Sequence, residues 1–244
     1  MIDLQKIILA ATIFLTLLAC NTEDNLMTGP DINPGPSPTV DTVIAYLALG
    51  DSYTIGTSVQ ASERWPVQLT EQLLEREGIR VEPLEIIARN GWRTDNLANA
   101  LSAGDPGSDF DLVSLLIGVN DQYQGFSVAA YRPQFERLLQ RSIGYAGGDS
   151  SAVFVVSIPD YAYTPFGGGS ESVSRDIDAF NEAAAAVCQS YGVPFYNITP
   201  ISRDGLRDPA LVADDGLHPS GQQYRRWVSE VLRTQVAAQI LRTD

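Results

Sequence analysis

The sequence ALGDSYTIG, residues 48–56, lies at the end of a run of seven apolar or aromatic residues that begins at Val43. Such an uninterrupted run is typical of a strand buried on both faces of a parallel sheet. The run stops at Gly50, which lets the backbone turn sharply, and Ser52 follows at the expected carboxyl end of the strand. Open α/β sheets place their chemistry at that edge, so a nucleophile is expected there.

Apolar runs alternate with amphipathic stretches along the rest of the chain. We expect strands at 43–49, 84–88, 110–117, 152–158 and 193–198. We expect helices at about 62–78, 94–103, 128–142, 173–191 and 220–241, because apolar side chains recur there every three or four residues. Ser62 and Ser220 are the expected N-caps of the first and last helix. The alternation predicts an α/β three-layer sandwich, with a five-stranded parallel sheet, helices on both faces and right-handed crossovers.

Three further short blocks follow predicted strand ends. Asn90 and Gly91 follow the second strand, residues 118–121 follow the third, and residues 215–219 follow the fifth. The carboxyl ends of parallel strands lie along one edge of a sheet, so these blocks and Ser52 are expected to converge. Random polar residues would be divided between both edges.

The four blocks, in this order from Gly50 to Pro219, resemble the SGNH or GDSL-type hydrolase family of esterases, lipases and related acyl hydrolases. The resemblance implies a flavodoxin-like SGNH hydrolase fold and a serine hydrolase that cleaves carboxylic esters through an acyl-serine. It implies a catalytic triad of Ser52, Asp215 and His218. It implies an oxyanion hole made by the amides of Ser52 and Gly91 and the side chain of Asn120.

The only histidine of the chain is His218. A lone histidine is more often structural than catalytic, but Asp215 lies three residues before it. On one short turn the carboxylate can accept a hydrogen bond from Nδ1–H and leave Nε2 free to take the proton of Ser52. Asp215 could instead cap the last helix, although Ser220 lies closer to that helix. The joint spacing of the three residues favours catalysis.

The oxyanion candidates also have structural interpretations. Glycine at position 91 would let the backbone approach a substrate closely, but Asn-Gly is also a common turn pair. Asn120 is either an oxyanion donor or a loop cap. One such donor contributes roughly 2.7–4 kcal/mol to catalysis. Asp51 and Asp121 are expected to brace the loops rather than to react.

Aromatic residues beside these blocks are candidates for the substrate pocket: Tyr53, Tyr123, Phe126, Tyr161, Tyr163 and Phe166. They are equally compatible with ordinary loop packing. The glycines at 167–169 suggest that one loop moves. Nothing here separates a short- to medium-chain carboxylesterase or lipase from a thioesterase or a carbohydrate deacetylase. A non-catalytic, ligand-binding surface lipoprotein of the same fold is a further alternative.

The composition bounds the class of protein. A chain of 244 residues with 44% hydrophobic content can bury one substantial core, so one folded domain is expected. A net charge of −14 repels phosphate backbones and argues against a nucleic-acid partner. One histidine and no cysteine cluster argue against a catalytic zinc site. Without a Gly-rich phosphate loop, no nucleotide cofactor is expected.

Residues 1–19 have the pattern of a lipoprotein signal peptide. The uncharged run at 7–19 follows Lys6, and it has the length of a signal-peptide core but is short for a membrane span. It ends in LLAC, residues 17–20, which is similar to a bacterial lipobox. We therefore expect a lipid on Cys20 that holds the protein at a membrane of the bacterial cell envelope. An ordinary secretory signal and an uncleaved anchor helix are the alternatives.

The stretch between the signal peptide and the first strand is rich in glycine, proline and acidic residues and has no apolar periodicity. Residues 20–41 are therefore expected to form a flexible tether, and residues 42–244 the hydrolase domain. If Cys20 carries a lipid, Cys188 is left without a disulfide partner in the chain. Its expected role is that of a small buried apolar residue.

Overall fold

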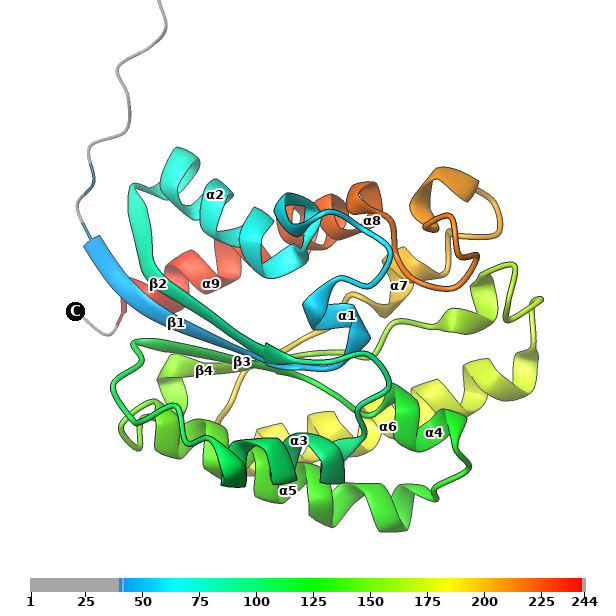
Figure 1. Ribbon diagram of the computed structural model, residues 1–244, viewed down its shortest axis with the longest axis horizontal. Helices are drawn as coiled ribbons and strands as arrows, with labels where there is room; N and C mark the ends of the chain where they lie inside the picture. Colours follow the sequence, from blue (N-terminus) through cyan, green and yellow to red (C-terminus); the bar gives the residue numbers. More distant parts are fainter. Residues whose placement is uncertain (1–39, 41, 243–244) are drawn as a thin grey trace, which may run out of the picture. The chain divides into compact units, whose positions relative to one another are not determined.

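A five-stranded parallel sheet lies between two layers of helices (Figure 1). The computed structural model describes residues 40 and 42–242, which fall within one compact unit. The strands are β1 (Thr42–Gly50), β2 (Ile79–Ala88), β3 (Leu112–Leu116), β4 (Val153–Val156) and β5 (Phe195–Tyr196). They are arranged in the order β2-β1-β3-β4-β5, with parallel pairing throughout. This order confirms the predicted flavodoxin-like α/β sandwich.

The long helices divide between the two faces of the sheet (Figure 1). One layer holds α2 (Trp65–Glu77), α8 (Gly221–Arg226), a π-helical segment (Trp227–Leu232) and α9 (Arg233–Ile240). The other holds α3 (Thr94–Ala103), α5 (Val128–Tyr145) and α6 (Glu171–Tyr191). Three short helices follow strand ends: α1 (Ser52–Ile55), α4 (Val119–Tyr123) and α7 (Thr199–Ser202). The described residues also form four 3-10 turns, at Ala61–Glu63, Ser150–Ala152, Tyr161–Tyr163 and Pro209–Leu211.

Two predicted helices differ from the observed ones at their ends. The prediction that Ser62 caps the first helix was wrong, because residues 61–63 form a 3-10 turn and α2 starts at Trp65 after Arg64. At the other end of the chain, Ser220 does cap its helix, and its Oγ accepts the amide of Gln223 at 3.2 Å. That helix is not continuous, because a π-helical segment separates α8 from α9.

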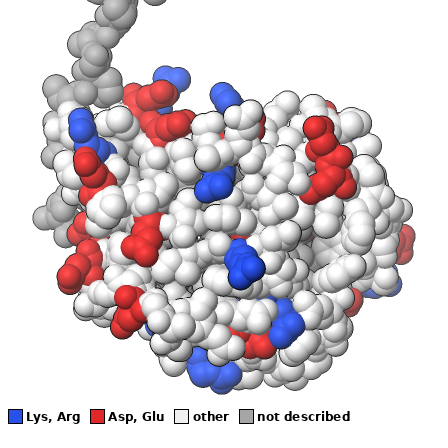
Figure 2. Space-filling model, viewed as in Figure 1, with Lys and Arg blue, Asp and Glu red and all other residues white. Residues whose placement is uncertain are grey.

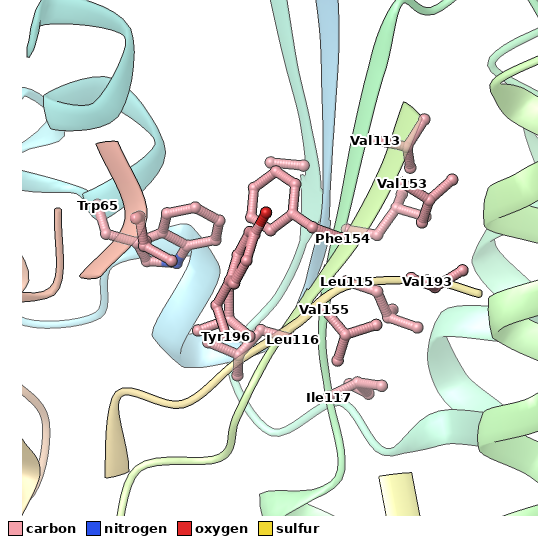
Figure 3. Close-up of a cluster of buried hydrophobic side chains, with 14 of the residues drawn as sticks. Trp65, Val113, Leu115, Leu116, Ile117, Val153, Phe154, Val155, Val193 and Tyr196 are labelled. Atoms are coloured by element: carbon pink, nitrogen blue, oxygen red, sulfur yellow. The ribbon is translucent and has the colours of Figure 1, made fainter. Parts of the chain in front are cut away.

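The core fills both faces of the sheet around β3 and β4 (Figure 3). On one face, the ring of Phe154 lies 6.3 Å from that of Trp65 and 5.5 Å from that of Tyr196. On the other face lie smaller side chains, including those of Val113 and Val153. Burying each such side chain contributes about 1.5–3 kcal/mol. The sheet is therefore a rigid base for the loops at its carboxyl edge.

Cys188 is fully buried in α6, in agreement with its predicted role. Burial raises the pKa of its thiol to about 12, so this thiol stays protonated and unreactive.

The predicted signal peptide, Cys20 and nearly all of the predicted tether lie outside the described residues. Within the described part of the chain, no helix combines the length and apolar character needed to cross a membrane. Acidic and basic side chains are interspersed on the face shown in Figure 2.

Candidate active site

The turn between β1 and α1 presents Ser52 at the carboxyl edge of the sheet. A side chain at Gly50 would place its Cβ 2.6 Å from the carbonyl oxygen of Leu116, so only glycine fits this crossing. Asp51 then caps α1, and its Oδ1 accepts the amide of Tyr53 at 2.9 Å. Ser52 is the first residue of this helix, and its own amide has no partner within the helix. The chain thus places Ser52 at the wall of a cavity.

The candidate acid and base, Asp215 and His218, lie together on the loop before α8. His218 Nδ1 lies 2.6 Å from Asp215 Oδ2. Asp215 Oδ1 accepts the amides of Leu217 and His218, each at 2.9 Å. Burial tends to raise the pKa of Asp215, but its hydrogen bonds outweigh this effect and hold the pKa well below its usual range. The carboxylate therefore stays ionised and can orient the imidazole.

The structure brings His218 and Ser52 to the same cavity, although they are far apart in the chain. Both side chains line it, and the edge of the Tyr53 ring lies against His218 with 5.7 Å between ring centroids. In the described part of the chain, no hydrogen bond joins the Ser52 hydroxyl to the imidazole. Such bonds in ligand-free sites are often long and tighten when the substrate binds.

Asn120 and Gly91 occupy two loops beside Ser52. The Asn120 side chain lines the cavity, and its Nδ2 donates to the carbonyl of Trp92 at 2.9 Å, which leaves one N–H for another acceptor. Gly91 has a φ of +80° and lies in a turn in which the amide of Trp92 donates a hydrogen bond to the carbonyl of Arg89 at 3.2 Å. Gly91 does not itself line the cavity, whereas its neighbour Asn90 does.

Two buried carboxyl groups brace the loops, as expected. Asp121 accepts the amide of Thr94 at 3.0 Å and the hydroxyl of Thr94 at 2.6 Å, so it ties α4 to the start of α3. Burial raises the pKa of Asp121. It also raises the pKa of Asp51, to about 8. Neither side chain lines the cavity beside Ser52.

The cavity has a volume of about 190 Å³. It is lined by Ser52, Tyr53, Asn90, Val119, Asn120, Tyr123, Tyr161, Phe166, Leu217 and His218. Four of the predicted pocket residues are in this lining, but Phe126 and Tyr163 are not. The Arg93 guanidinium lies 5.3 Å from the centre of the Phe126 ring, and the Arg203 guanidinium lies 6.0 Å from that of Tyr163. Both rings therefore pack against arginines instead of facing the cavity.

Sequence reasoning missed three residues of the lining, namely Asn90, Val119 and Leu217. Each directly precedes a residue that the motifs had singled out, at position 91, 120 or 218. That adjacency is the signal that could have identified them, because a tight loop presents neighbouring residues to the same cavity.

An aromatic wall closes one side of the cavity, formed by Tyr123, Tyr161 and Phe166. Their ring centroids are 6.1–6.3 Å apart, and the Tyr161 hydroxyl donates to Gln122 Oε1 at 2.9 Å. Tyr123 and Phe166 are 59% and 54% exposed, so their rings form the rim. The Phe166 amide donates to the carbonyl of Gly216 at 2.9 Å and thereby joins this wall to the loop of His218.

The glycines at 167–169 are held in place by backbone hydrogen bonds rather than left free. The amide of Gly168 donates to Thr164 at 2.9 Å, and that of Gly169 donates to Ala162 at 2.8 Å. A Cβ on Gly167 would overlap the carbonyl of Tyr161, so glycine is required there for a close backbone contact. Gly167 therefore has a packing role, and motion of the loop stays a prediction.

The cavity contains no aspartate, glutamate, lysine or arginine among its lining residues. Among the residues that the structure describes, no cluster of three or more histidines, cysteines or acidic residues has the arrangement of a metal site. The chemistry that the site offers is therefore that of a hydroxyl, an imidazole, a carboxylate behind it and neutral hydrogen-bond donors.

Comparisons with known proteins agree with this geometry. The model of the GDSL-like lipase/acylhydrolase family matches residues 48–226. No curated protein matches the chain. The esterase EstA from Pseudoalteromonas sp. is similar in structure, with a TM-score of 0.61 and 17% identity over 82% of this chain and 100% of that one.

Two further solved structures are similar. The lipase/acylhydrolase from Enterococcus faecalis has a TM-score of 0.58 and 20% identity over 82% of this chain and 94% of that one. The acetylxylan esterase Axe2 from Geobacillus stearothermophilus has a TM-score of 0.60 and 16% identity over 84% of this chain and 96% of that one. At these identities the structural matches show a shared fold, while the family model covers most of the chain. The chain therefore belongs to the GDSL-like lipase/acylhydrolase family.

Proposed function

We propose that the protein hydrolyses neutral carboxylic esters through an acyl intermediate on Ser52. The observation that carries this proposal is the placement of Ser52 and His218 in one cavity, with Asp215 Oδ2 at 2.6 Å from Nδ1 of the imidazole. This placement supports the activation of Ser52 by His218.

In the proposed mechanism, His218 moves the protons. Asp215 accepts a hydrogen bond from the Nδ1–H group and so fixes the tautomer in which Nε2 is a base. As Ser52 Oγ bonds to the ester carbonyl carbon, Nε2 takes the hydroxyl proton. The tetrahedral intermediate collapses when His218 returns this proton to the leaving alcohol. Water then attacks the acyl-serine with His218 again as base, and the acid is released.

The negative charge on the carbonyl oxygen of the intermediate needs hydrogen-bond donors. The proposed donors are the Ser52 amide at the start of α1 and the Nδ2 group of Asn120. The family resemblance implies the Gly91 amide as a third donor, although it is Asn90, the neighbour of Gly91, that lines the cavity. The bond from Asn120 to Trp92 fixes the orientation of that side-chain amide before the substrate arrives. Donors that are already oriented do not have to reorganise during the reaction, which is why they are effective.

The cavity favours uncharged substrates with short or medium acyl groups. Its volume of about 190 Å³ is below the roughly 300–1,000 Å³ of pockets that enclose drug-sized ligands. Its lining has no basic side chain to pair with the phosphates of a nucleotide thioester, which disfavours a thioesterase. A short- to medium-chain carboxylesterase or lipase fits these properties best.

The second candidate is a deacetylase of acetylated carbohydrates. The exposed rings of Tyr123 and Phe166 at the rim favour it, because aromatic faces can pack against the apolar face of a sugar. The acetylxylan esterase named above has the same fold. Comparing p-nitrophenyl esters from acetate to palmitate with acetylated sugars would distinguish these candidates. Turnover of acetylated sugars well above that of the simple esters would favour the deacetylase.

The central experiment is the Ser52→Ala variant. Purified wild-type protein should hydrolyse p-nitrophenyl acetate, and Ser52→Ala should lose nearly all of this turnover while it keeps the wild-type circular dichroism spectrum. A fluorophosphonate probe should label the wild type and not the variant. Wild-type protein that neither turns over esters nor reacts with the probe would favour a non-catalytic binding protein.

We further propose that a lipid on Cys20 holds the enzyme at the cell envelope, with a signal peptide at residues 1–19 and a tether at 20–41. The supporting observation is the LLAC sequence after an uncharged apolar run of signal-peptide length. Growth with a clickable fatty acid should label the wild type and leave Cys20→Ala unlabelled. Equal labelling of the two proteins would rule the anchor out.

A further inference from the structure

The loop after α1 makes a direct contact with the acid of the site. Ser58 Oγ donates a hydrogen bond to Asp215 Oδ2 at 2.6 Å, across 157 positions of the chain. The same oxygen lies 2.6 Å from His218 Nδ1. Ser58 does not line the cavity, so this hydroxyl can reach the reaction only through Asp215.

The backbone of Ser58 is held in an uncommon conformation. Its φ is +67°, and it is the one non-glycine residue with positive φ among the residues the structure describes. Glycine would adopt this conformation without strain, but it could not supply the hydroxyl. Strained residues cluster at functional sites, and the hydrogen bond to Asp215 is the contact that a serine makes at this position and a glycine could not.

Ser58 is also tied to the nucleophile through a short stretch of backbone. The amides of Gly56 and Thr57 both donate to the carbonyl of Ser52 at 3.0 Å. Ser58 follows directly, so its position is set by the residue that carries the nucleophile. The hydrogen bond to Asp215 therefore joins the loop of the nucleophile to the loop of the acid and base.

Four donors surround the Asp215 carboxylate. The amides of Leu217 and His218 bind Oδ1, while Ser58 and the imidazole bind Oδ2. Among these hydrogen bonds, that of Ser58 contributes most to the low pKa of Asp215, against the opposing effect of burial. The phenols of Tyr53 in α1 and Tyr224 in α8 are titratable groups on other elements that interact electrostatically with Asp215.

We propose that Ser58 is a positioning residue, whose hydroxyl holds Asp215 in the orientation that directs His218 toward Ser52. The proposal rests on the acyl-serine mechanism proposed above. Without the hydroxyl, Oδ2 keeps one donor, and the carboxylate can rotate away from Nδ1 and accept water. The imidazole is then less often in the orientation that takes the Ser52 proton.

The test is a double-mutant cycle between Ser58 and Asp215. Ser58→Gly removes the hydroxyl and suits the backbone conformation. We expect it to lower kcat/KM for p-nitrophenyl acetate about tenfold, the effect of one hydrogen bond to a charged group, with the loss in kcat rather than KM. In an Asp215→Asn background the same change should cost less than about twofold, because the carboxylate on which Ser58 acts is already gone.

Two control variants separate the hydroxyl from the backbone. Ser58→Ala also lacks the hydroxyl and should lose as much activity as Ser58→Gly. Ser62→Ala removes another exposed serine hydroxyl nearby and should keep wild-type kcat/KM. Wild-type kcat/KM in Ser58→Gly, or an equal fold loss in both backgrounds, would overturn the positioning role. Neither result would affect the requirement for Ser52, whereas wild-type turnover by Ser52→Ala would overturn the proposed mechanism itself.

Discussion

Asp51, the residue before the proposed nucleophile, should make the stability of the protein depend on pH. Its side chain is fully buried, and its Oδ2 has no hydrogen-bond partner among the described residues. Burial, the largest effect, raises the pKa of this carboxyl from 3.8 to about 8. At neutral pH the folded protein therefore holds a proton on Asp51 that the unfolded chain has already released.

A folded state that binds more protons than the unfolded state loses stability as the pH rises. A carboxyl whose pKa is about 4 when unfolded and about 8 when folded lowers the free energy of unfolding by about 4 kcal/mol between about pH 5 and pH 8.5. The loss is steepest below the folded pKa and levels off above it, where the carboxyl is ionised in both states.

The Asp51→Asn variant should remove this dependence. The amide oxygen can still accept the amide of Tyr53, and the side chain stays neutral at every pH. Urea-induced unfolding measured from about pH 5 to pH 8.5 should show the wild type losing about 4 kcal/mol more than the variant. All other titrating groups are shared, so the difference isolates Asp51. Identical pH dependence in the two proteins would refute the reasoning.

Three further changes test individual contacts in the structure. Gly50→Ala should destabilise the fold by about 1–3 kcal/mol in urea unfolding, because the new Cβ would meet the Leu116 carbonyl; unchanged stability would contradict this close contact. Arg203→Gln removes the guanidinium that pairs with the fully buried Asp160 at 2.9 Å. Removing one partner of this pair should lower the free energy of unfolding by about 3 kcal/mol, and an unchanged melting temperature would argue against a contribution of the pair to stability. In Cys20→Ala protein, the buried Cys188 thiol should react with a thiol reagent only after unfolding, and rapid labelling of folded protein would contradict its burial.

The layers of the fold could be predicted because apolar runs and helical periodicity follow directly from burial. The ends of the strands could not. Residues 193–198 are a largely apolar run, yet only Phe195–Tyr196 pair with β4 at this edge of the sheet. β2 extends back to Ile79, beyond the predicted start at 84, because its pairing with β1 continues through a register shift between Ile44 and Tyr46. Such pairing depends on the neighbouring strand, which local sequence does not report.

The site could be predicted where chemistry lies in short motifs at strand ends. The motifs drew attention to Ser52, Asn120 and His218, which the structure places around one cavity. Loop aromatics gave a weaker signal, because a ring can pack against a neighbouring arginine as readily as face a pocket, and Phe126 does the former. The contact between Ser58 and Asp215 had no local signature at all. It depends on how two distant loops meet, which periodicity and turn preferences do not describe.

The backbone tie between Phe166 and Gly216 bears on how this enzyme could be redesigned. Because that bond fixes the aromatic loop to the one that carries the imidazole, lengthening either loop would disturb the proton-transfer residues along with the entrance. The exposed ring of Phe166 projects from this fixed backbone, and the exposed ring of Tyr123 projects from the end of α4. Trimming those two side chains is therefore the route by which a bulkier acid or alcohol could be admitted while the reacting groups stay in register.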